Sequence, residues 1–398
     1  MKRLITFQFI IICIILSSCQ FRSGVGSSDQ DYKVAAYYWP AYHDEPRWRN
    51  FFDGAEGEWE IIRNAIPKYE GHRQPRVPLW GYEDETDPRV MEKKIDAAVS
   101  HNVNVFIFDW YWYEGEPFLE ECINEGFLGA ENIDQIEFYI MWANHASTTL
   151  WDKRLSHELD TIWTGEVDRY NFDIITDRII SQYMTHPSYF KIDGKPVFSI
   201  YELGTLIKGL GGIEGTREAL DAFREKVRQA GFPNLHIQAM LWGNLPETGS
   251  NVPGDQVKTQ NNTVEALGIN SLTNYQYVHL SSPVDDYIDW CNTAIAKWDQ
   301  WDQEFSIPFF PHVSSDWDTN SRFHGYSPCL KKGVNPGNFK IYMEKAKAYM
   351  DNHSDQIKLV TINSWNEWSE GSYLEPDTEF GYGYLEAVRD VFGLNGSE

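Results

Sequence analysis

The sequence predicts an α/β fold, a single (β/α)8 TIM barrel, and three observations lead to this prediction. Short apolar or β-branched runs recur along the chain, amphipathic segments lie between them, and no linker or low-complexity stretch divides residues 32–398. Strand alternating with helix indicates a parallel sheet, and about eight such units indicate closure into a barrel. A single domain of this length is long, but α/β barrels reach it.

The predicted strands are short and rich in β-branched and aromatic residues, as expected for strands that are buried on both faces. In chain order they are Val34–Tyr38, Val105–Trp110, Phe138–Ala143, Val197–Tyr201, His236–Leu241, Leu272–Gln276, Phe309–Val313 and Val360–Asn363. Helices are predicted between them where apolar residues recur at i, i+3 and i+4. Examples are Val90–Ser100, Ile174–Met184, Thr216–Ala230, Asp285–Trp298 and Asn338–Asp351. An open doubly wound sheet is the alternative, but no glycine-rich phosphate fingerprint follows the first strand, which favours the barrel.

The first residues have the pattern of an export signal. Met1-Lys2-Arg3 precedes an apolar run, Leu4–Leu16, that is too short to span a bilayer, and Leu16-Ser17-Ser18-Cys19 resembles the lipobox of bacterial lipoproteins. We therefore predict a lipoprotein signal peptide over residues 1–18, and a lipidated Cys19 with a flexible polar tether over residues 19–31. The catalytic barrel, 32–398, would be exported and anchored by its lipid to a bacterial membrane, at the cell surface or the periplasmic face. An ordinary signal peptide with a chance cysteine is the alternative.

The acidic composition excludes several classes of partner. The net charge is −25, and removal of Lys2 and Arg3 with the signal peptide would make it −27. Such acidity disfavours binding to nucleic acid or to anionic membrane surfaces. The remaining cysteines, Cys122, Cys291 and Cys329, are odd in number and widely spaced, so we predict buried thiols and neither a disulfide framework nor a zinc site. We predict no metal, no cofactor, and a monomer as the default state.

Aromatic residues beside polar ones indicate a sugar as the ligand. The chain has 16 Trp and 22 Tyr, and many follow a predicted strand directly, together with polar residues. Ring faces stack on the C–H faces of sugars while polar groups bond to hydroxyls, and residues beyond the strands of a barrel lie at the face where active sites are found. The predicted sugar-binding residues from these clusters are Asp109, Trp110, Trp112, Trp142, Asn144, His145, Asp316 and Trp317. A structural salt bridge is the alternative for Asp109, and loop packing is the alternative for Asn144 and His145.

Glu367 and Glu370 lie three residues apart, immediately beyond the last predicted strand. In a helical turn both carboxylates would project to one side, with about 5–6 Å between their Cβ atoms. Two carboxyls near one bond can divide the roles of acid and base, because burial and mutual repulsion separate their pKa values. An exposed pair on a surface turn is the alternative, but the flanking aromatic residues would make a poor solvated surface. We predict that this pair is catalytic and that Trp365, Asn366, Trp368 and Tyr373 contribute to sugar binding.

Five blocks of the sequence resemble the WbsX-like proteins, which are related to glycoside hydrolase family 99, the endo-α-mannosidase family. The blocks are Ala36-Tyr37-Tyr38-Trp39-Pro40, Tyr69-Glu70-Gly71-His72-Arg73-Gln74-Pro75-Arg76-Val77-Pro78, Trp110-Tyr111-Trp112, Trp142-Ala143-Asn144 and Ser364-Trp365-Asn366-Glu367-Trp368-Ser369-Glu370-Gly371-Ser372-Tyr373-Leu374-Glu375-Pro376-Asp377. The resemblance implies the barrel fold and hydrolysis or transfer at a glycosidic bond. His72 and Arg76 lie in the second block, and we expect them either to reach the pocket or to brace the barrel.

The resemblance also implies a mechanism, because the Glu-x-x-Glu pair of family 99 enzymes matches Glu367 and Glu370. The first would remove the proton from the sugar 2-hydroxyl, and the second would protonate the leaving oxygen and later activate water. This route passes through a 1,2-anhydro sugar, retains the anomeric configuration and needs a 1,2-trans glycoside with a free 2-hydroxyl. WbsX-like sequences usually have Glu where this chain has His145, which bears on the identity of the substrate more than on the reaction.

The main prediction is therefore a retaining glycoside hydrolase that acts on a polysaccharide or oligosaccharide. A WbsX-type glycosyltransferase is one alternative, and it would need a nucleotide-sugar donor, for which no phosphate-binding loop is visible in the sequence. A glycan-binding surface lipoprotein that lacks catalysis is the other alternative, and loss of either glutamate would favour it. Both glutamates are present.

Overall fold

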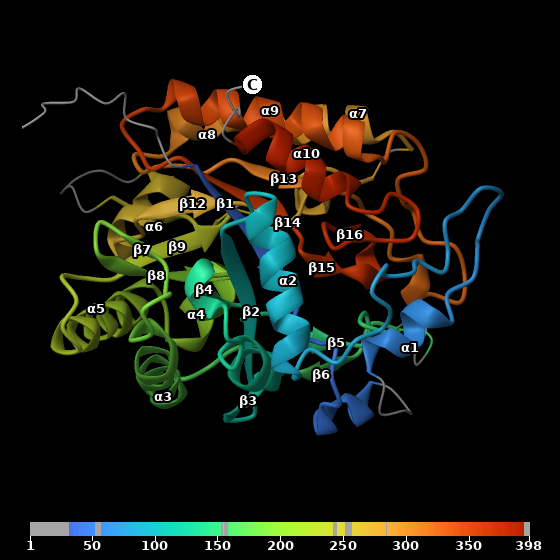
Figure 1. Cartoon of the computed structure of the whole chain (residues 1–398). Coiled ribbons are helices and arrows are strands. Elements are labelled where there is room, and N and C mark those ends of the chain that lie inside the picture. The colour runs from blue at the N-terminus through green and yellow to red at the C-terminus, as the bar shows by residue number, and fades with distance from the viewer. Residues whose placement is uncertain are drawn as a thin grey trace, which may run out of the picture. The chain divides into compact units, whose positions relative to one another are not determined.

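Eight parallel strands form the core of the computed structural model (Figure 1). They are β1 (Lys33–Tyr38), β2 (Val105–Tyr113), β4 (Glu137–Trp142), β8 (Lys195–Ile200), β9 (His236–Met240), β12 (Ser271–Thr273), β13 (His312–Ser314) and β14 (Leu359–Asn363). Neighbours in chain order pair with one another from β1 to β12, and β14 pairs with both β13 and β1. A parallel bridge between Leu272 and Phe309 links β12 to the segment that leads into β13. The ring is therefore nearly closed, which confirms the predicted barrel and excludes the open doubly wound sheet.

The structure describes residues 32–51, 57–152, 154, 158–241, 245–250, 257–283 and 285–393. The predicted signal peptide, Cys19 and the tether lie outside these residues. Tyr32–Glu398 group into one unit by their contacts. Within the described ranges, no helix has the length and apolar character needed to cross a membrane.

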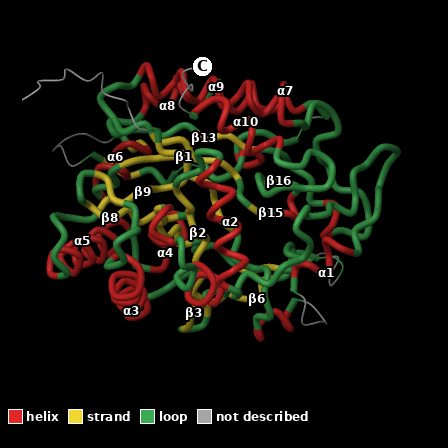
Figure 2. Tube along the Cα trace, in the orientation of Figure 1, coloured by secondary structure: helices red, strands yellow, loops and turns green. Residues whose placement is uncertain are grey.

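Helices cover the outside of the strand ring (Figure 2). They are α1 (Glu58–Arg63), α2 (Pro88–Ser100), α3 (Arg169–Ile179), α4 (Leu203–Gly209), α5 (Ile213–Gln229), α6 (Gln260–Leu267), α7 (Tyr287–Ile295), α8 (Trp298–Glu304), α9 (Pro336–Asn352) and α10 (Gly383–Phe392). The five predicted helices correspond to α2, to α3 with the π-helical turn Ile180–Met184 that continues it, and to α5, α7 and α9. Local sequence explains where two of them begin: Asp87 and Asn335 cap α2 and α9 through their side chains, and a proline follows each cap.

Short strand pairs and turns lie beyond the carboxyl ends of the barrel strands. Pairs are formed by β5 (Ser147–Thr148) with β6 (Thr161–Trp163) and by β15 (Asn366–Glu367) with β16 (Ser372–Tyr373). Figure 1 shows these four strands and α1 on the same side of the barrel. Four further short strands complete the strands of the described chain: β3 (Glu116–Phe118), β7 (Lys191–Ile192), and β10 (Thr248–Gly249), which pairs with β11 (Lys258–Thr259).

Strands and helices share one cluster of buried apolar side chains, and the barrel strands also bury polar side chains that bond to one another, such as Thr273 to Thr361. Every residue of β2 is buried, as is expected for a strand covered on both faces. Cys122, Cys291 and Cys329 are buried and free, which confirms the prediction of buried thiols. Burial raises the pKa of the Cys122 thiol well above its usual value, so this group is a poor nucleophile.

Candidate active site

A cavity of about 230 Å³ opens at the carboxyl ends of the barrel strands. Its wall contains three carboxyl groups, one guanidinium, two imidazoles and a set of aromatic rings. The carboxyls are Asp109, Glu367 and Glu370, the guanidinium is Arg322, the imidazoles are His145 and His279, and the rings are Trp39, Tyr111, Trp151, Tyr201, Tyr275 and Trp317. This is the face at which the active sites of (β/α)8 barrels lie.

The turn after β15 places both predicted catalytic glutamates in the cavity. Glu367 ends β15, and Trp368–Glu370 form a single 3-10 turn, so the predicted helical turn is present in a tighter form. Gly371 ends the turn with φ of 71°, and a Cβ there would lie 2.8 Å from Nη2 of Arg76, so the position requires glycine. The backbone N–H of Glu367 donates to Oγ of Ser364 at 2.8 Å, which fixes the start of the turn.

Arg322 joins the two glutamates. Its Nη1 lies 3.0 Å from Oε1 of Glu370, and its Nη2 lies 3.8 Å from Oε2 of Glu367. The same Nη2 lies 3.4 Å from Oε1 of Glu58, a buried residue of α1 whose carboxyl also bonds to Ser369 and Trp39. One buried guanidinium thus faces three carboxyl groups, so the cluster has an excess of negative charge if all three are ionised.

Tyr275 joins the third carboxyl of the cavity to the pair. Its hydroxyl oxygen lies 2.7 Å from Oδ2 of Asp109 and 2.7 Å from Oε1 of Glu367. A phenol has one hydrogen to donate, so both contacts are hydrogen bonds only when one of the two carboxyls is protonated and donates to the tyrosine oxygen. The geometry therefore fits a proton shared among Asp109, Tyr275 and Glu367.

The surroundings raise the pKa of all three cavity carboxyls. Burial raises the pKa of Glu367 well above its usual value, and the charge of Glu370 adds to this effect. Burial also raises the pKa of Glu370, but Arg322 opposes it. Burial raises the pKa of Asp109, while the hydrogen bond from Tyr275 opposes it. Carboxyls that repel one another in a dry site hold protons near neutral pH, which is the property that a general acid needs.

The two histidines of the wall are neutral. Burial lowers the pKa of His145, and burial is also the largest cause that lowers the pKa of His279, to about 3. Nδ1 of His145 lies 2.9 Å from the carbonyl oxygen of Ala146, so this nitrogen carries the hydrogen and Nε2 is an acceptor. The cavity therefore offers His145 as an acceptor for a hydroxyl group.

Each cavity carboxyl has one buried oxygen without a hydrogen-bond partner among the described residues. These atoms are Oδ1 of Asp109, Oε2 of Glu367 and Oε2 of Glu370. Buried polar atoms are nearly always hydrogen-bonded, so such atoms at the wall of a cavity indicate positions for ligand donors. Aromatic rings stand beside them: Trp39, Tyr111 and Trp151 pack edge to face, with ring centroids 5.5–5.8 Å apart. Hydroxyl donors and the C–H faces of a sugar match this combination.

Five of the predicted site residues line the cavity: Asp109, His145, Trp317, Glu367 and Glu370. The predicted Trp110, Trp112, Trp142 and Asn144 do not line it, because successive side chains of a strand point to opposite faces. Nε1 of Trp110 donates to Glu120 and Nε1 of Trp112 to Asn171, while the Asn144 amide pairs with the backbone of Glu202. Trp142 is fully buried.

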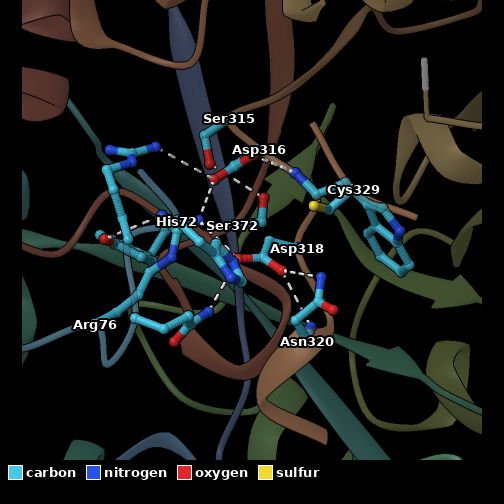
Figure 3. Close-up of polar contacts among 12 residues, drawn as sticks. His72, Arg76, Ser315, Asp316, Asp318, Asn320, Cys329 and Ser372 are labelled. Atoms are coloured by element: carbon cyan, nitrogen blue, oxygen red, sulfur yellow. Dashed lines mark hydrogen bonds and ion pairs between the residues drawn. The ribbon is translucent and has the colours of Figure 1, made fainter. Parts of the chain in front are cut away.

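His72, Arg76 and Asp316 belong to one network of polar contacts (Figure 3). None of the three lines the cavity. Nδ1 of His72 accepts from the backbone N–H of Lys68, so its Nε2 donates to Oδ2 of Asp318, at 2.8 Å. Nη2 of Arg76 lies 2.7 Å from Asp316 and 3.4 Å from Asp318. These contacts hold the loop that carries Trp317 toward the cavity. We expected His72 and Arg76 either to reach the pocket or to brace the barrel, and these contacts fit the second role.

The same network includes a set of possible metal ligands, His72, Asp318 and Cys329. Burial opposes ionisation of Asp318, but the hydrogen bond from His72 and the charge of Arg76 hold its pKa well below the usual value. Both ring nitrogens of His72 are already engaged, and an arginine already neutralises the carboxylate. A cation would have to displace these partners, so the arrangement does not fit a metal.

The remaining predicted residues, Trp365, Asn366, Trp368 and Tyr373, support the wall from behind and do not line it. The Asn366 amide accepts from the backbone N–H of Trp39 at 2.8 Å and donates to its carbonyl at 2.9 Å, which ties the end of β1 to β15. Trp368 and Tyr373 stack with their ring centroids 3.8 Å apart, and the Trp365 ring packs against Phe106.

Sequence reasoning did not select several residues of the wall. Tyr111 lies between two tryptophans that we did select, and the two-residue period of the strand places it on the same face as Asp109. Tyr275 lies in the predicted strand Leu272–Gln276, at the end where site residues are expected. Arg322 and Trp151 do not directly follow a predicted strand and have no periodic pattern around them, so no local signal identifies them.

Three comparisons relate the chain to known proteins. The family model described as "Glycosyltransferase WbsX" matches residues 34–388. Two curated relatives from strains of Xanthomonas campestris pv. campestris, each named "Uncharacterized protein WxcX", are 23% identical over 363 residues, which is 90% of this chain. The match covers 49% of each relative, so the chain spans about half the length of the curated relatives it matches.

Solved structures share the fold. A structure titled "Glycoside hydrolase-like protein" is 15% identical with a TM-score of 0.59, and the match covers 92% of this chain and 96% of that one. The GH99 endo-α-mannosidase from Bacteroides thetaiotaomicron, in complex with Bis-Tris propane, is 16% identical with a TM-score of 0.56, covering 91% and 95%. At sequence identities this low, the structural similarity shows a common barrel fold and nothing beyond the fold.

Proposed function

The chain belongs to the family described as Glycosyltransferase WbsX, and we propose that it is a carbohydrate-active enzyme that hydrolyses a glycosidic bond with retention of configuration. One observation carries the proposal. Glu367 and Glu370, three residues apart in the sequence, meet Asp109 at the wall of a cavity at the carboxyl ends of the barrel strands. Asp109 and Glu367 are buried, and the side chain of Glu370 is 12% exposed. Glycosidic bonds are commonly cleaved by such pairs of carboxyl groups.

We assign the two roles as the resemblance implies. Glu367 takes the proton of the sugar 2-hydroxyl as the 2-oxygen displaces the leaving group at the anomeric carbon, and Glu370 gives a proton to the leaving oxygen. Glu370 then takes a proton from water, whose oxygen opens the 1,2-anhydro sugar at the anomeric carbon, and Glu367 returns its proton to the 2-oxygen. This division of roles requires that the two glutamates together hold one proton. Mutual repulsion of the two carboxyls favours this state.

The contacts of Arg322 favour that proton on Glu367. Arg322 touches Glu370 at 3.0 Å and Glu367 only at 3.8 Å, so it favours the ionised form of Glu370. For Glu370 to act first as the acid, the bound sugar must move the proton from one carboxyl to the other. Measurements that separate the two roles are therefore a direct test of the mechanism, and they are described in the Discussion.

The charges of the cavity favour a sugar without a negative charge. Among the lining residues that the structure describes, Arg322 is the one Lys or Arg side chain, and it is engaged with glutamates. Three carboxyls would repel a uronic acid or a sulfated sugar, and the neutral histidines do not compensate. We propose that an uncharged residue of a polysaccharide or oligosaccharide, linked 1,2-trans and with a free 2-hydroxyl, occupies the cavity.

Glycosyl transfer is the second candidate, because the description of the family names it. A nucleotide-sugar donor carries a diphosphate, which proteins usually bind with cations or with backbone N–H groups at a helix N-terminus. The acidic lining of the cavity argues against such a donor. A glycan-binding protein without catalysis is disfavoured by the three raised carboxyl pKa values, which a binding site does not need.

A glycan panel tests the proposal. The protein is incubated with neutral and with anionic plant, fungal and bacterial polysaccharides, and the products are separated by chromatography. We expect new reducing ends from at least one neutral glycan, and none from the double variant Glu367→Gln/Glu370→Gln. A glycan that binds without being cut would support the binding protein instead. Transfer from a nucleotide sugar to an acceptor, abolished by the same variant, would support the transferase.

A further inference from the structure

A second group of titratable side chains lies outside the cavity, where the segments after β1 and β3 meet. We propose that His43, Glu45 and Glu121 bind one divalent transition-metal ion, for which zinc is the best match. One ligand atom from each residue lies within 4.8 Å of the other two. None of the three lines the cavity with the catalytic carboxyls.

The spacing of the first two ligands already matches a bound zinc ion. Two ligand atoms on one tetrahedral zinc, each about 2.0–2.2 Å from the metal, lie about 3.3–3.6 Å apart. Nε2 of His43 lies 3.4 Å from Oε2 of Glu121. Glu121 is half-exposed, with 46% of its side chain accessible, so it can adjust around an ion without disturbing the core.

His43 provides an independent indication of a ligand. Its side chain is 1% exposed, and neither ring nitrogen makes a hydrogen bond of good geometry among the described residues; Nε2 has the 3.4 Å contact with Oε2 of Glu121. Buried polar atoms without hydrogen-bond partners are rare in native proteins and call for an explanation. A metal ion bound to Nε2 would satisfy the nitrogen that faces Glu121.

The two glutamates bring like charges together. Oε1 of Glu45 accepts from the backbone N–H of Arg47 at 2.9 Å, and Oε2 accepts from that of Leu119 at 3.2 Å, so this carboxyl is held in place. A carboxylate oxygen of Glu45 lies within 4.8 Å of one of Glu121. The guanidinium of Arg47 is directed to Glu114 and Glu116. A divalent cation would neutralise both glutamates at once.

The ligand types select the kind of metal. An imidazole nitrogen with two carboxylate oxygens suits zinc, with water as a fourth ligand, whereas calcium and magnesium prefer oxygen alone. The ion would join the 3-10 turn Pro46–Asn50, which Glu45 caps, to the π-helical turn Cys122–Phe127, which follows Glu121. Trp48 of the first turn packs against Trp39 and Trp151 of the cavity wall, so the metal would stabilise this wall.

Metal content gives the first test. The purified chain is loaded with zinc chloride, dialysed and analysed by mass spectrometry for metals. We expect about one zinc per chain for the wild type and for the control Glu125→Gln, an exposed glutamate of the same π-helical turn, and at least a tenfold loss in Glu121→Gln and in His43→Gln. Because Glu121 is half-exposed, that variant should fold even if His43→Gln does not, and circular dichroism checks this.

Cobalt substitution gives the second test and separates this site from the network that contains Cys329. Cobalt bound by His43, Glu45 and Glu121 should show ligand-field bands without a thiolate-to-metal charge-transfer band, and Cys329→Ser should leave the spectrum unchanged. Zinc should also raise the melting temperature of the wild type but not that of Glu121→Gln. Absence of stoichiometric zinc and cobalt binding, or full binding in Glu121→Gln, would overturn the proposal. Neither readout depends on the proposed glycosidase activity.

Discussion

The hydroxyl oxygen of Tyr275 lies 2.7 Å from Oε1 of Glu367, and the same oxygen lies 2.7 Å from Oδ2 of Asp109. A donor that bonds to a carboxylate favours its ionised form. The one phenol hydrogen can go to only one of the two carboxyls at a time, and when it goes to Glu367 it favours the ionised form that must accept the 2-hydroxyl proton. Removing the hydroxyl takes this hydrogen bond away.

We therefore predict that Tyr275→Phe lowers kcat/KM about 10- to 100-fold, the scale of one or two hydrogen bonds to charged groups. The acid limb of the pH profile of kcat/KM should move to higher pH, because the carboxyl that has to be ionised now has a higher pKa. The control is Tyr342→Phe, which removes a hydroxyl that bonds to α7 away from the cavity. An unchanged acid limb in Tyr275→Phe would show that Tyr275 has a packing role alone.

The fold could be predicted because its signal is strong and local. Each barrel strand is a short apolar run, and the structure has a strand at or next to every predicted position. The predicted strand Phe309–Val313 differs in its bounds, because β13 begins only at His312. Pro311 has no N–H to donate to a ladder, so Phe309 forms an isolated bridge and the regular strand starts after the proline.

The cavity was only partly predictable, for two physical reasons. The sequence places Asp109, Trp110, Tyr111 and Trp112 at the end of a strand. It does not show by itself which alternate side chains of this strand point into the barrel and which point toward the helices. Asp109 and Tyr111 line the cavity, and the tryptophans face the helices. Arg322 reaches the glutamates from a distant loop, and such a contact depends on the tertiary fold and leaves no mark in the local pattern.

Arg322 should make stability depend on pH. It is 4% exposed, and its charge lowers the pKa of Glu367 and of Glu370, although burial still raises both. In Arg322→Gln both pKa values rise further above their unfolded values. A carboxyl with a raised pKa contributes stability that is fully present below its unfolded pKa and is lost as the pH rises through its folded pKa.

We therefore expect Arg322→Gln to lose about 3–5 kcal/mol of unfolding free energy near neutral pH, the scale for leaving buried charges unpaired. The loss should shrink at about pH 5, where the carboxyls take up protons more readily. Urea unfolding of wild type and variant at both pH values measures the difference. Arg322→Lys, which keeps the charge, should recover part of the loss at neutral pH. An equal loss at both pH values would contradict the electrostatic explanation.

The roles of the two glutamates can be separated with leaving groups of different acidity. On the natural glycan, Glu367→Gln and Glu370→Gln should each lower turnover by at least about a hundredfold, the scale for losing acid–base catalysis. The phenolate of an aryl glycoside with an acidic phenol departs without being protonated. On this substrate Glu370→Gln should therefore regain much of the rate of the first step, while Glu367→Gln should not. Glu379→Gln, in an exposed turn, is the control. Recovery in Glu367→Gln instead would exchange the two assignments, which is the order that the contacts of Arg322 favour.

We propose that Cys19 is lipidated, on the basis of Leu16-Ser17-Ser18-Cys19 and of the polar segment after it. Several acyl chains on one residue give a stable membrane anchor, so the protein made in a bacterial host should enter the detergent phase on partitioning. Cys19→Ala should remain in the aqueous phase, and Cys122→Ala, which removes a buried thiol of the barrel, should partition like the wild type. Equal partitioning of wild type and Cys19→Ala would end this proposal.

The stereochemistry of the reaction follows from the proposed participation of the sugar 2-hydroxyl. The 2-oxygen must attack from the face opposite the departing bond, so the 2-oxygen and the leaving group are trans on the ring. Water then opens the 1,2-anhydro sugar from the other side, and two inversions give net retention. The substrates are thereby restricted to 1,2-trans glycosides with a free 2-hydroxyl, such as α-mannosides, α-rhamnosides, β-glucosides or β-galactosides.

A 2-deoxy or 2-O-methyl analogue of such a substrate should bind and remain uncut, because it has no internal nucleophile. If Glu367 were itself the nucleophile, as in the usual retaining scheme, the 2-deoxy analogue would still be cleaved and an ester between sugar and enzyme would form. Proton NMR of the first-formed anomer and mass spectrometry of the intact protein during turnover distinguish these routes. We expect the retained anomer and no added mass. An inverted product would exclude both retaining routes, and a sugar ester on Glu367 would exclude participation of the 2-hydroxyl, because a single carboxylate cannot be both the base for the 2-hydroxyl and the atom that bonds to the anomeric carbon.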